Sequence, residues 1–221
     1  MAVAVILTLG GGAVFAQDQA INSESARYTA GNGWYLGASL GQSYINLNDV
    51  CSRNLQPLYT SGFSCSTKNA AVGLRLFAGY QIIENLAVEG GYVDLGQGSV
   101  SSAGNVGITP STADLTLKSN GLAADVILTL PITHEFGVFG RLGTFFWEVA
   151  ETPNASGGLV ANGNQSSSGA SFDFGIGAKY DFDSKTGIRA EYQLFKNVGD
   201  PNTTGRGDIG LISASLLYRF N

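Results

Sequence analysis

Apolar residues alternate with polar or small residues along most of the chain. The clearest case is 172–182, where Phe, Ile, Ala and Tyr occupy the even positions and Asp, Gly and Lys the odd ones. A period of two is typical of a β-strand with one apolar face. The alternation recurs over 34–41, 73–82, 86–92, 188–194 and 212–220, and 117–130 and 136–147 are less regular but β-like. The pattern therefore predicts eight strands.

The connections between these strands alternate in length. Short ones fall at Ile83–Asn85, Ile132–Glu135 and Asp183–Thr186, and long ones, rich in Gly, Ser, Asn and Thr, cover about 46–69, 98–115, 151–168 and 198–208. Outer-membrane barrels have tight periplasmic turns and long extracellular loops, whereas a soluble sandwich has no reason to sort its loops by parity. We therefore expect residues 32–221 to form an all-β, eight-stranded antiparallel transmembrane up-and-down β-barrel. Its four long loops would be extracellular and both termini periplasmic.

Composition supports this class and excludes another. Charged residues make up 13% of the chain and hydrophobic residues 44%, and such a charge content is low for a soluble globular protein. The net charge is −5, and no basic stretch is concentrated enough to neutralise phosphates. Nucleic acid is therefore not expected as a partner.

The first residues indicate export. Residues 1–16 are apolar and end in Ala13-Val14-Phe15-Ala16, a small-x-x-small cleavage context, although no Lys or Arg follows Met1. We interpret 1–16 as a signal peptide with an incomplete or mis-assigned start, and 17–31 as an N-terminal periplasmic segment. The alternative is a buried or disordered apolar tail.

The two cysteines fit an exported protein. Cys51 and Cys65 enclose a short polar stretch, and an oxidising compartment favours disulfides. A bridge of this size contributes about 3 kcal/mol on the chain-entropy model. The alternative is two free thiols. Because His134 is the only histidine, no His/Cys cluster suggests a zinc site, and no metal or cofactor is expected.

If the apolar rows face lipid, the charged rows face a lumen that eight strands leave only wide enough for side chains. The inward charges would be Arg75, Arg141, Lys179, Arg189 and Arg219 against Glu89, Asp125, Asp173, Asp181 and Glu191. Five cations would thus balance five anions, as a sealed ion-pair network requires. Catalytic carboxylates need substrate access, which a filled lumen denies, so a structural network is the preferred interpretation.

Ordered motifs carry a family resemblance over nearly all of residues 32–220. They are Asn32-Gly33-Trp34-Tyr35, Gly79-Tyr80-Gln81, Val88-Glu89-Gly90-Gly91-Tyr92, Leu130-Pro131-Ile132-Thr133, Arg141-Leu142-Gly143, Arg189-Ala190-Glu191-Tyr192-Gln193, Asn197-Val198-Gly199-Asp200 and Tyr218-Arg219-Phe220. The set resembles the N-terminal barrel of the OmpA family of bacterial outer-membrane proteins.

The resemblance implies an interior gate, and this sequence departs from it. In the family a glutamate on strand three pairs with basic residues on neighbouring strands; Glu89 and Arg189 match two members. The family's strand-four lysine corresponds to Ile127, however, and its strand-six glutamate to Lys179. We therefore expect an interior network, with Lys179 as the hypothetical replacement cation for Glu89.

The resemblance also implies location and partners. A barrel of this family sits in outer-membrane lipid and lipopolysaccharide, and the assembly machinery would read the aromatics Tyr218 and Phe220, although Asn221 follows them. Family members continue into a peptidoglycan-binding domain, so the chain is either a barrel-only relative or part of a longer protein that tethers peptidoglycan.

Three functions compete. The first is a non-enzymatic structural barrel that supports envelope integrity and presents its loops to a surface partner. The second is a small-conductance pore through the crowded lumen. The third is an enzyme like the barrel-shaped lipid A palmitoyltransferase, which needs a catalytic His at the outer rim. His134 is expected at a periplasmic turn, which argues against an enzyme.

One loop tripeptide has a possible surface role. Arg206-Gly207-Asp208 is the tripeptide that integrins recognise. The preferred interpretation is a polar turn in which Gly205 and Gly207 supply backbone freedom.

Overall fold

The computed structural model describes residues 33–47, 51, 55–161 and 163–220. The predicted signal peptide and periplasmic segment lie outside the described residues. The elements are β1 (Gly33–Ile45), the 3-10 turn η2 (Gln56–Leu58), β2 (Ser61–Lys68), β3 (Ala70–Ile83), β4 (Leu86–Val106), β5 (Thr109–Pro131), β6 (Phe136–Ser156), β7 (Gln165–Asp181), β8 (Thr186–Val198) and β9 (Gly207–Arg219). No helix among the described residues has the length and apolarity to cross a membrane.

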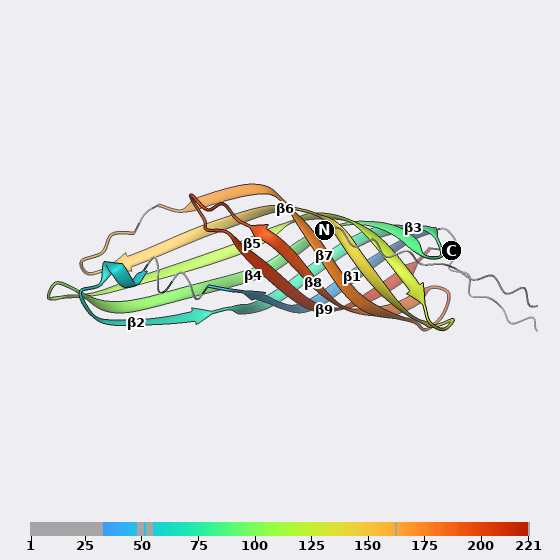
Figure 1. Ribbon diagram of the computed structural model, residues 1–221, viewed down its shortest axis with the longest axis horizontal. Coiled ribbons are helices and arrows are strands. Elements are labelled where there is room, and N and C mark those ends of the chain that lie inside the picture. Colours follow the sequence, from blue (N-terminus) through green and yellow to red (C-terminus); the bar gives the residue numbers. More distant parts are fainter. Residues whose placement is uncertain (1–32, 48–50, 52–54, 162, 221) are drawn as a thin grey trace, which may run out of the picture.

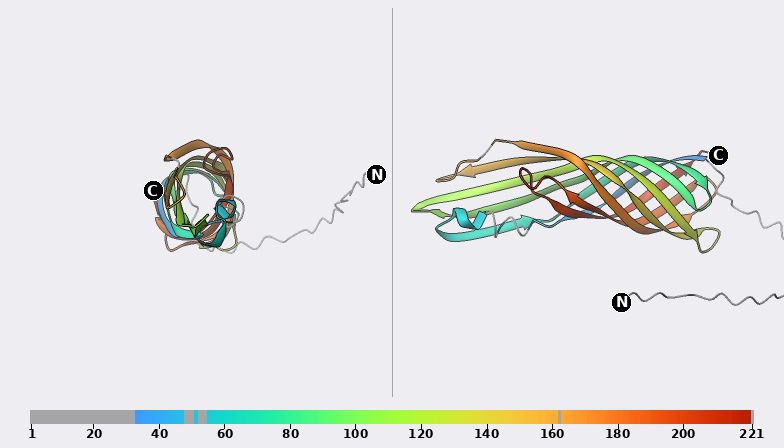
Figure 2. Two further views of the ribbon diagram at one scale, coloured as in Figure 1. Left: turned by 90° about the vertical axis from the view of Figure 1, so that its left-hand side faces the viewer. Right: turned by 45° about the horizontal axis from the view of Figure 1, so that its top comes forward.

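Eight strands close into a ring (Figure 2). The order is β4-β3-β1-β9-β8-β7-β6-β5, and pairing of β4 with β5 completes the circle. All the pairings are antiparallel. The ninth strand, β2, pairs with β4 outside the ring and is followed after one residue by β3. The predicted fold class is therefore confirmed.

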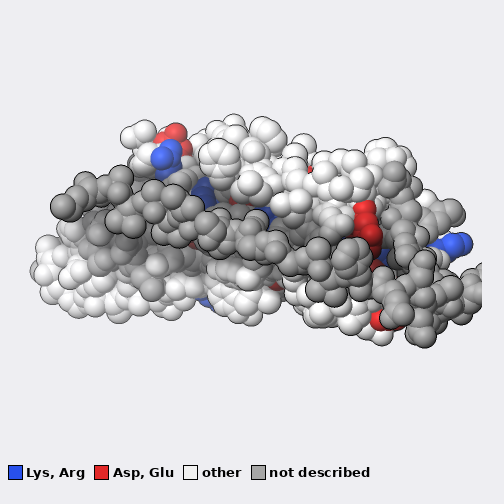
Figure 3. Space-filling view, turned by 45° about the vertical axis from the view of Figure 1, so that its right-hand side comes forward, with Lys and Arg blue, Asp and Glu red and all other residues white. Residues whose placement is uncertain are grey.

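The outer wall of the ring is apolar. Large side chains that a soluble protein would bury are open to the surroundings: Ile176 is 70% exposed and Leu216 68%. On the face drawn in Figure 3, most of the visible wall carries neither acidic nor basic residues. Because the closed ring satisfies the backbone hydrogen bonds of its strands, such a wall is suited to hydrocarbon.

Most exposed aromatic residues of this wall form two bands, and Tyr192, in register with Ile176, lies between them. Around the end with the short turns lie Trp34, Phe136, Tyr180, Phe182, Tyr218 and Phe220, and toward the other end lie Tyr44, Tyr92, Phe146 and Phe172. On β1 and β6 the two bands are about ten residues apart, which is the length of a tilted membrane-spanning strand. Bands of this kind mark the two membrane interfaces of outer-membrane barrels.

The short turns gather at one end of the barrel (Figure 1). The turn between β7 and β8 is held by hydrogen bonds to Asp183. Its carboxylate accepts from the Thr186 hydroxyl and from the N–H groups of Lys185 and Thr186. These bonds, led by the Thr186 hydroxyl, hold the pKa of Asp183 below its usual value. At the same end, the Phe220 N–H donates to the Trp34 carbonyl, so the described parts of both chain ends lie together.

The long connections differ from the prediction. Most of 98–115 is a hairpin in which β4 and β5 stay paired out to Val106 and Thr109, and parts of 46–69 and 151–168 also belong to strands β2, β6 and β7. Ser- and Thr-rich sequence was interpreted as loop, yet Thr is favourable in strands, and continued pairing satisfies the backbone. These strands project beyond the barrel (Figure 1). The connection 198–208 is close to the predicted loop, because β8 ends at Val198 and β9 begins at Gly207.

A bulge reverses the inward row of β4. Val93 and Leu95 are buried, but after the register shift between Asp94 and Gln97 the buried positions continue at Gly98 and Val100. Gly96 lies within the shift at φ +77, a conformation that glycine adopts without strain. A single extra residue therefore exchanges the two faces of the strand.

The predicted disulfide is confirmed. Cys51 and Cys65 are bonded, with a Cα–Cα distance of 6.0 Å. Both cysteines pack against the apolar core that fills the outer half of the barrel, and Cys65 lies in β2. The bridge thus fastens the segment after β1 to the projecting strands.

Replacing outward Ile176 with Arg should destabilise the barrel by about 2–4 kcal/mol, because the charge enters the bilayer midplane. Arg at Ile132, which is 58% exposed in a short turn, is the control and should cost at most about 1 kcal/mol. Denaturant unfolding in lipid vesicles measures both. Arg at inward Gly177 should act through crowding, because even a Cβ there would lie 2.5 Å from the Phe139 ring. Equal stability of wild type and Ile176→Arg would reverse the inside/outside assignment.

Reduction of the disulfide should leave the barrel folded but speed proteolysis between the cysteines, because the bridge restrains that segment. Limited proteolysis with and without reductant, followed by mass spectrometry, locates the cuts. The Cys51→Ser/Cys65→Ser variant is the control and should be cut at one rate in both conditions. Unchanged resistance of the reduced wild type would show that packing alone holds the segment.

Candidate functional site: the charged layer inside the barrel

Four neighbouring strands place a row of acids and one glycine at a single level of the lumen. Glu89 on β4 is in register with Asp125 on β5, Asp125 with Gly143 on β6, and Gly143 with Asp173 on β7. The acids all point inward because each occupies the inward position of its strand's two-residue repeat. All three are buried.

Three arginines meet these acids from other strands. Arg75 Nη2 lies 2.5 Å from Asp125 and 3.4 Å from Glu89. Arg141 Nη1 lies 2.7 Å from Asp125 and 3.0 Å from Glu89, and its Nη2 lies 3.0 Å from Glu191. Arg189 pairs with the second oxygen of Glu89. Glu89 is therefore shared by three guanidinium groups. We call Arg75, Arg141, Arg189, Glu89, Asp125, Asp173 and Glu191 the charged layer.

Two neutral residues extend the charged layer, and the sequence interpretation missed both. The Tyr35 hydroxyl donates to Glu89 Oε1 at 2.8 Å. Gln193 accepts from Arg75 Nη1 at 3.0 Å and donates to Asp173 Oδ1 at 2.7 Å. Both occupy inward positions of strands whose alternation was recognised, so their positions in the two-residue pattern could have identified them.

Apolar side chains seal the lumen on both sides of the charged layer. Toward the short turns, a cluster of Tyr35, Phe77, Ala87, Ile127, Phe139 and Leu217 fills the interior. The Arg189 guanidinium lies over the rings of Phe139 and Tyr35, at 5.2 and 5.4 Å from their centroids. Toward the projecting strands, a larger cluster includes Phe145 and Phe195, whose ring centroids are 4.7 Å apart.

Lys179 does not pair with Glu89, so the hypothesis that it is the replacement cation for Glu89 is wrong. Its Nζ pairs instead with Asp181 at 3.2 Å, and Asp181 also pairs with Arg219 at 2.5 Å. These three side chains form a separate and slightly more open group near the short turns. Glu89 obtains its cations from Arg75, Arg141 and Arg189, because β3, β6 and β8 bring them to its level.

The remaining predicted site residues lie away from the charged layer. Asp208 pairs with Lys196 and accepts from the Asn197 N–H, and Arg206 Nε donates to the Gly199 carbonyl, so the tripeptide 206–208 makes contacts within its own hairpin. Tyr218 and Phe220 face outward, with ring centroids 5.3 Å apart. His134 is exposed in the turn between β5 and β6.

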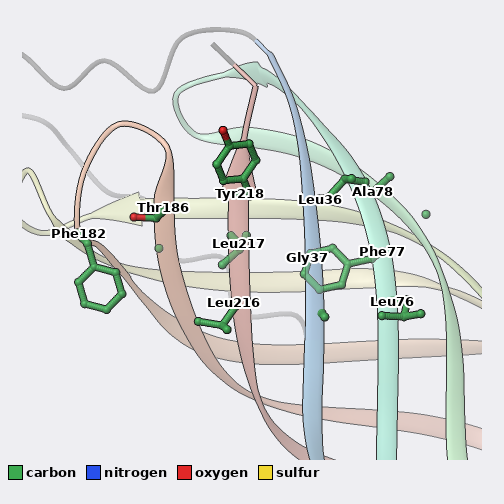
Figure 4. A pocket seen from close by; sticks show the side chains of 13 residues that line it. Leu36, Gly37, Leu76, Phe77, Ala78, Phe182, Thr186, Leu216, Leu217 and Tyr218 are labelled. Atoms are coloured by element: carbon green, nitrogen blue, oxygen red, sulfur yellow. The ribbon is translucent and has the colours of Figure 1, made fainter.

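A groove of about 730 Å³ on the outer wall offers apolar surface rather than chemistry. It lies over β1, β3 and β9, and its lining includes Leu36, Leu76, Phe182 and Leu216 (Figure 4). The hydroxyl groups of Thr186 and Tyr218 are the only polar side-chain groups among the residues that line it. The groove is part of the wall that faces lipid.

Comparison with known proteins agrees with this architecture. The family described as the OmpA-like transmembrane domain matches residues 29–221. Outer membrane protein A of Salmonella typhi is 32% identical over 193 residues, which cover 86% of this chain and 49% of that protein. Outer membrane protein A of Yersinia pseudotuberculosis is 31% identical over 191 residues, again 86% of this chain and 49% of that protein. The chain spans about half the length of the curated relatives it matches.

Among solved structures, Neisserial surface protein A superposes with a TM-score of 0.52 at 13% identity, covering 85% of this chain and 97% of that one. At that identity the likeness concerns the fold alone. Together with the match along 29–221, the closed ring and its apolar wall lead to one conclusion: this chain belongs to the OmpA-like transmembrane domain family and is a protein of the bacterial outer membrane.

Proposed function

We propose that this chain is a non-enzymatic structural protein of the outer membrane, in which a sealed barrel carries an extracellular platform for surface contacts. The observation that carries the proposal is the filled lumen, where the charged layer lies between two apolar clusters. Such an interior leaves neither a path for ions nor a cleft for a substrate, so the barrel acts as an anchor. The termini then lie in the periplasm.

The charged layer contributes stability and rigidity in this role. Each arginine is held by carboxylates on other strands, so the layer links β3, β4, β5, β6 and β8 across the lumen. A buried ion pair gains little over apolar packing, but removal of one partner leaves a buried charge uncompensated. Loss of any single charged partner therefore destabilises the barrel, and the intact layer fixes the relative positions of the strands.

The projecting strands support the second half of the proposal. Beyond Tyr92, the hairpin of β4 and β5 continues to Val106, roughly 45 Å of strand at 3.3 Å per residue and far more than the headgroup layer. Its tip residue Ile108 is 99% exposed, and Val160 in the next connection is 94% exposed. A pocket of about 360 Å³ between the projecting strands includes Leu58, Glu151 and Val160. These features would give a surface partner both apolar and acidic contacts.

Glu89→Gln should lower the free energy of unfolding by about 3–5 kcal/mol, because three guanidinium groups lose their shared anion. Urea titration of the protein in lipid vesicles measures the change. Glu148→Gln makes the same chemical change at an exposed position and should shift stability by less than about 0.5 kcal/mol. Equal stability of the two variants would mean that the charged layer contributes nothing to the fold.

Wild-type protein in planar lipid bilayers should carry no steady current, because three filled layers block the lumen in series. Phe145→Ala with Phe195→Ala, which opens only the outer apolar cluster, should remain closed for the same reason. A steady ohmic current through the wild type would contradict the sealed barrel and establish the pore function instead.

A further inference from the structure

Three buried carboxyl groups in the charged layer, Asp125, Asp173 and Glu191, each have an oxygen without a hydrogen-bond partner among the described residues. Asp125 Oδ1 and Asp173 Oδ2 accept no hydrogen bond from any described residue, although both side chains are closed off from solvent. The two acids are register partners of the same residue, Gly143, one on each side of it, so both carboxyls enter the lumen at one level. Two ionised carboxylates in that arrangement would repel, and neither oxygen could donate to the other.

The balance of charges within the charged layer also singles out Asp125 and Asp173. Three guanidinium groups, Arg75, Arg141 and Arg189, face four carboxyl groups: Glu89, Asp125, Glu191 and Asp173. The first three acids form ion pairs within the layer. Asp173 has no basic group within ion-pair distance among the described residues, although the sequence predicted five inward cations for five inward anions. A sealed layer with one surplus negative charge is strongly disfavoured.

The groups around Asp173 come from several strands. Asp125 lies two strands away on β5, and Arg75 lies across the lumen on β3, where its Nη2 pairs with Asp125 and Glu89. Arg75 reaches Asp173 only through the neutral amide of Gln193 on β8. On β6 the register partner is Gly143. Asp173 Oδ1 is therefore satisfied by an amide, and Oδ2 is left to Asp125.

Gly143 allows the two acids to meet. It is in register with Asp125 on one side and with Asp173 on the other, so the acids belong to strands that are separated by one strand. A Cβ at Gly143 would lie 2.1 Å from Asp125 Oδ1. The Asp125 carboxyl thus occupies the space that a side chain at position 143 would fill.

We infer that the Asp125–Asp173 pair is a proton-binding site: Asp173 is held in its neutral form, and its hydroxyl donates from Oδ2 to Asp125 Oδ1. One bound proton provides a partner for Asp125 Oδ1 and for Asp173 Oδ2, and it brings the layer to three positive and three negative charges. The site goes beyond the proposed structural function, because it makes the stability of the barrel depend on external pH.

Infrared spectroscopy of the full chain refolded in lipid vesicles tests for the proton directly. At pH 6 the wild type should show the C=O stretch of a protonated carboxyl, shifted in D₂O, and Asp173→Asn should lack it. Glu191→Gln makes an equivalent change at an ion-paired acid of the same layer and should retain the band. Absence of the band from the wild type, or its persistence in Asp173→Asn, would overturn the inference.

Unfolding equilibria give a second readout. An aspartate in the unfolded chain ionises at about pH 4, so unfolding above pH 5 releases the proton that the folded barrel keeps. The unfolding equilibrium constant should then rise about tenfold per pH unit while Asp173 stays protonated. Stability is thus greatest on the acidic side of this window and is lost as pH rises.

Asp173→Asn should remove that pH dependence and unfold no more easily than the wild type, because its amide N–H replaces the hydroxyl as donor to Asp125. Glu191→Gln should be less stable at every pH and keep the dependence. If Asp173→Asn is as destabilised as Glu191→Gln, the aspartate acts as an anion and the inference fails. A stability that follows NaCl concentration in place of pH would assign the site to a metal cation and would also overturn it.

Discussion

The closure of the backbone hydrogen-bond ring is the constraint on which the rest of the molecule depends. Hydrocarbon offers no partner to a free N–H or C=O, so a sheet survives there only without edges. The pairing of β4 with β5 removes the last edge. Closure with eight strands also sets the width of the lumen, which is just wide enough for side chains to fill.

Because side chains fill the lumen, most of those side chains are apolar. Aromatic and aliphatic side chains occupy most of the interior, above and below the charged layer. Charges persist at one level because Arg75 and Arg141 each have several acceptors there and Arg189 pairs with Glu89. Gln193 and Tyr35 add neutral hydrogen bonds. In so closed a space an unpaired charge is not solvated by water. The excess of one carboxyl over the three arginines is therefore the reason to infer a bound proton. The rim group of Lys179, Asp181 and Arg219 is more open and tolerates its surplus cation.

Outside the membrane the same strands have a different role. Once β4, β5 and β6 leave the bilayer, water can satisfy their backbone groups, and the ring no longer needs to close. Only part of the ring continues, joined by β2 and fastened by the Cys51–Cys65 bridge. The result is a closed barrel in lipid that carries an open sheet beyond it.

The sequence by itself determined the fold class, the number of membrane-crossing strands, the inward row of each strand and the disulfide. These features are local, because a period of two and the parity of connection lengths are both readable along the chain. Only the tertiary structure decided which charges meet. Lys179 and Arg189 both lie inward, yet strand stagger brings Arg189 to Glu89 and leaves Lys179 with Asp181. The bulge at Gly96 and the meeting of Asp125 with Asp173 over Gly143 were likewise decided by register between strands, which no single strand encodes.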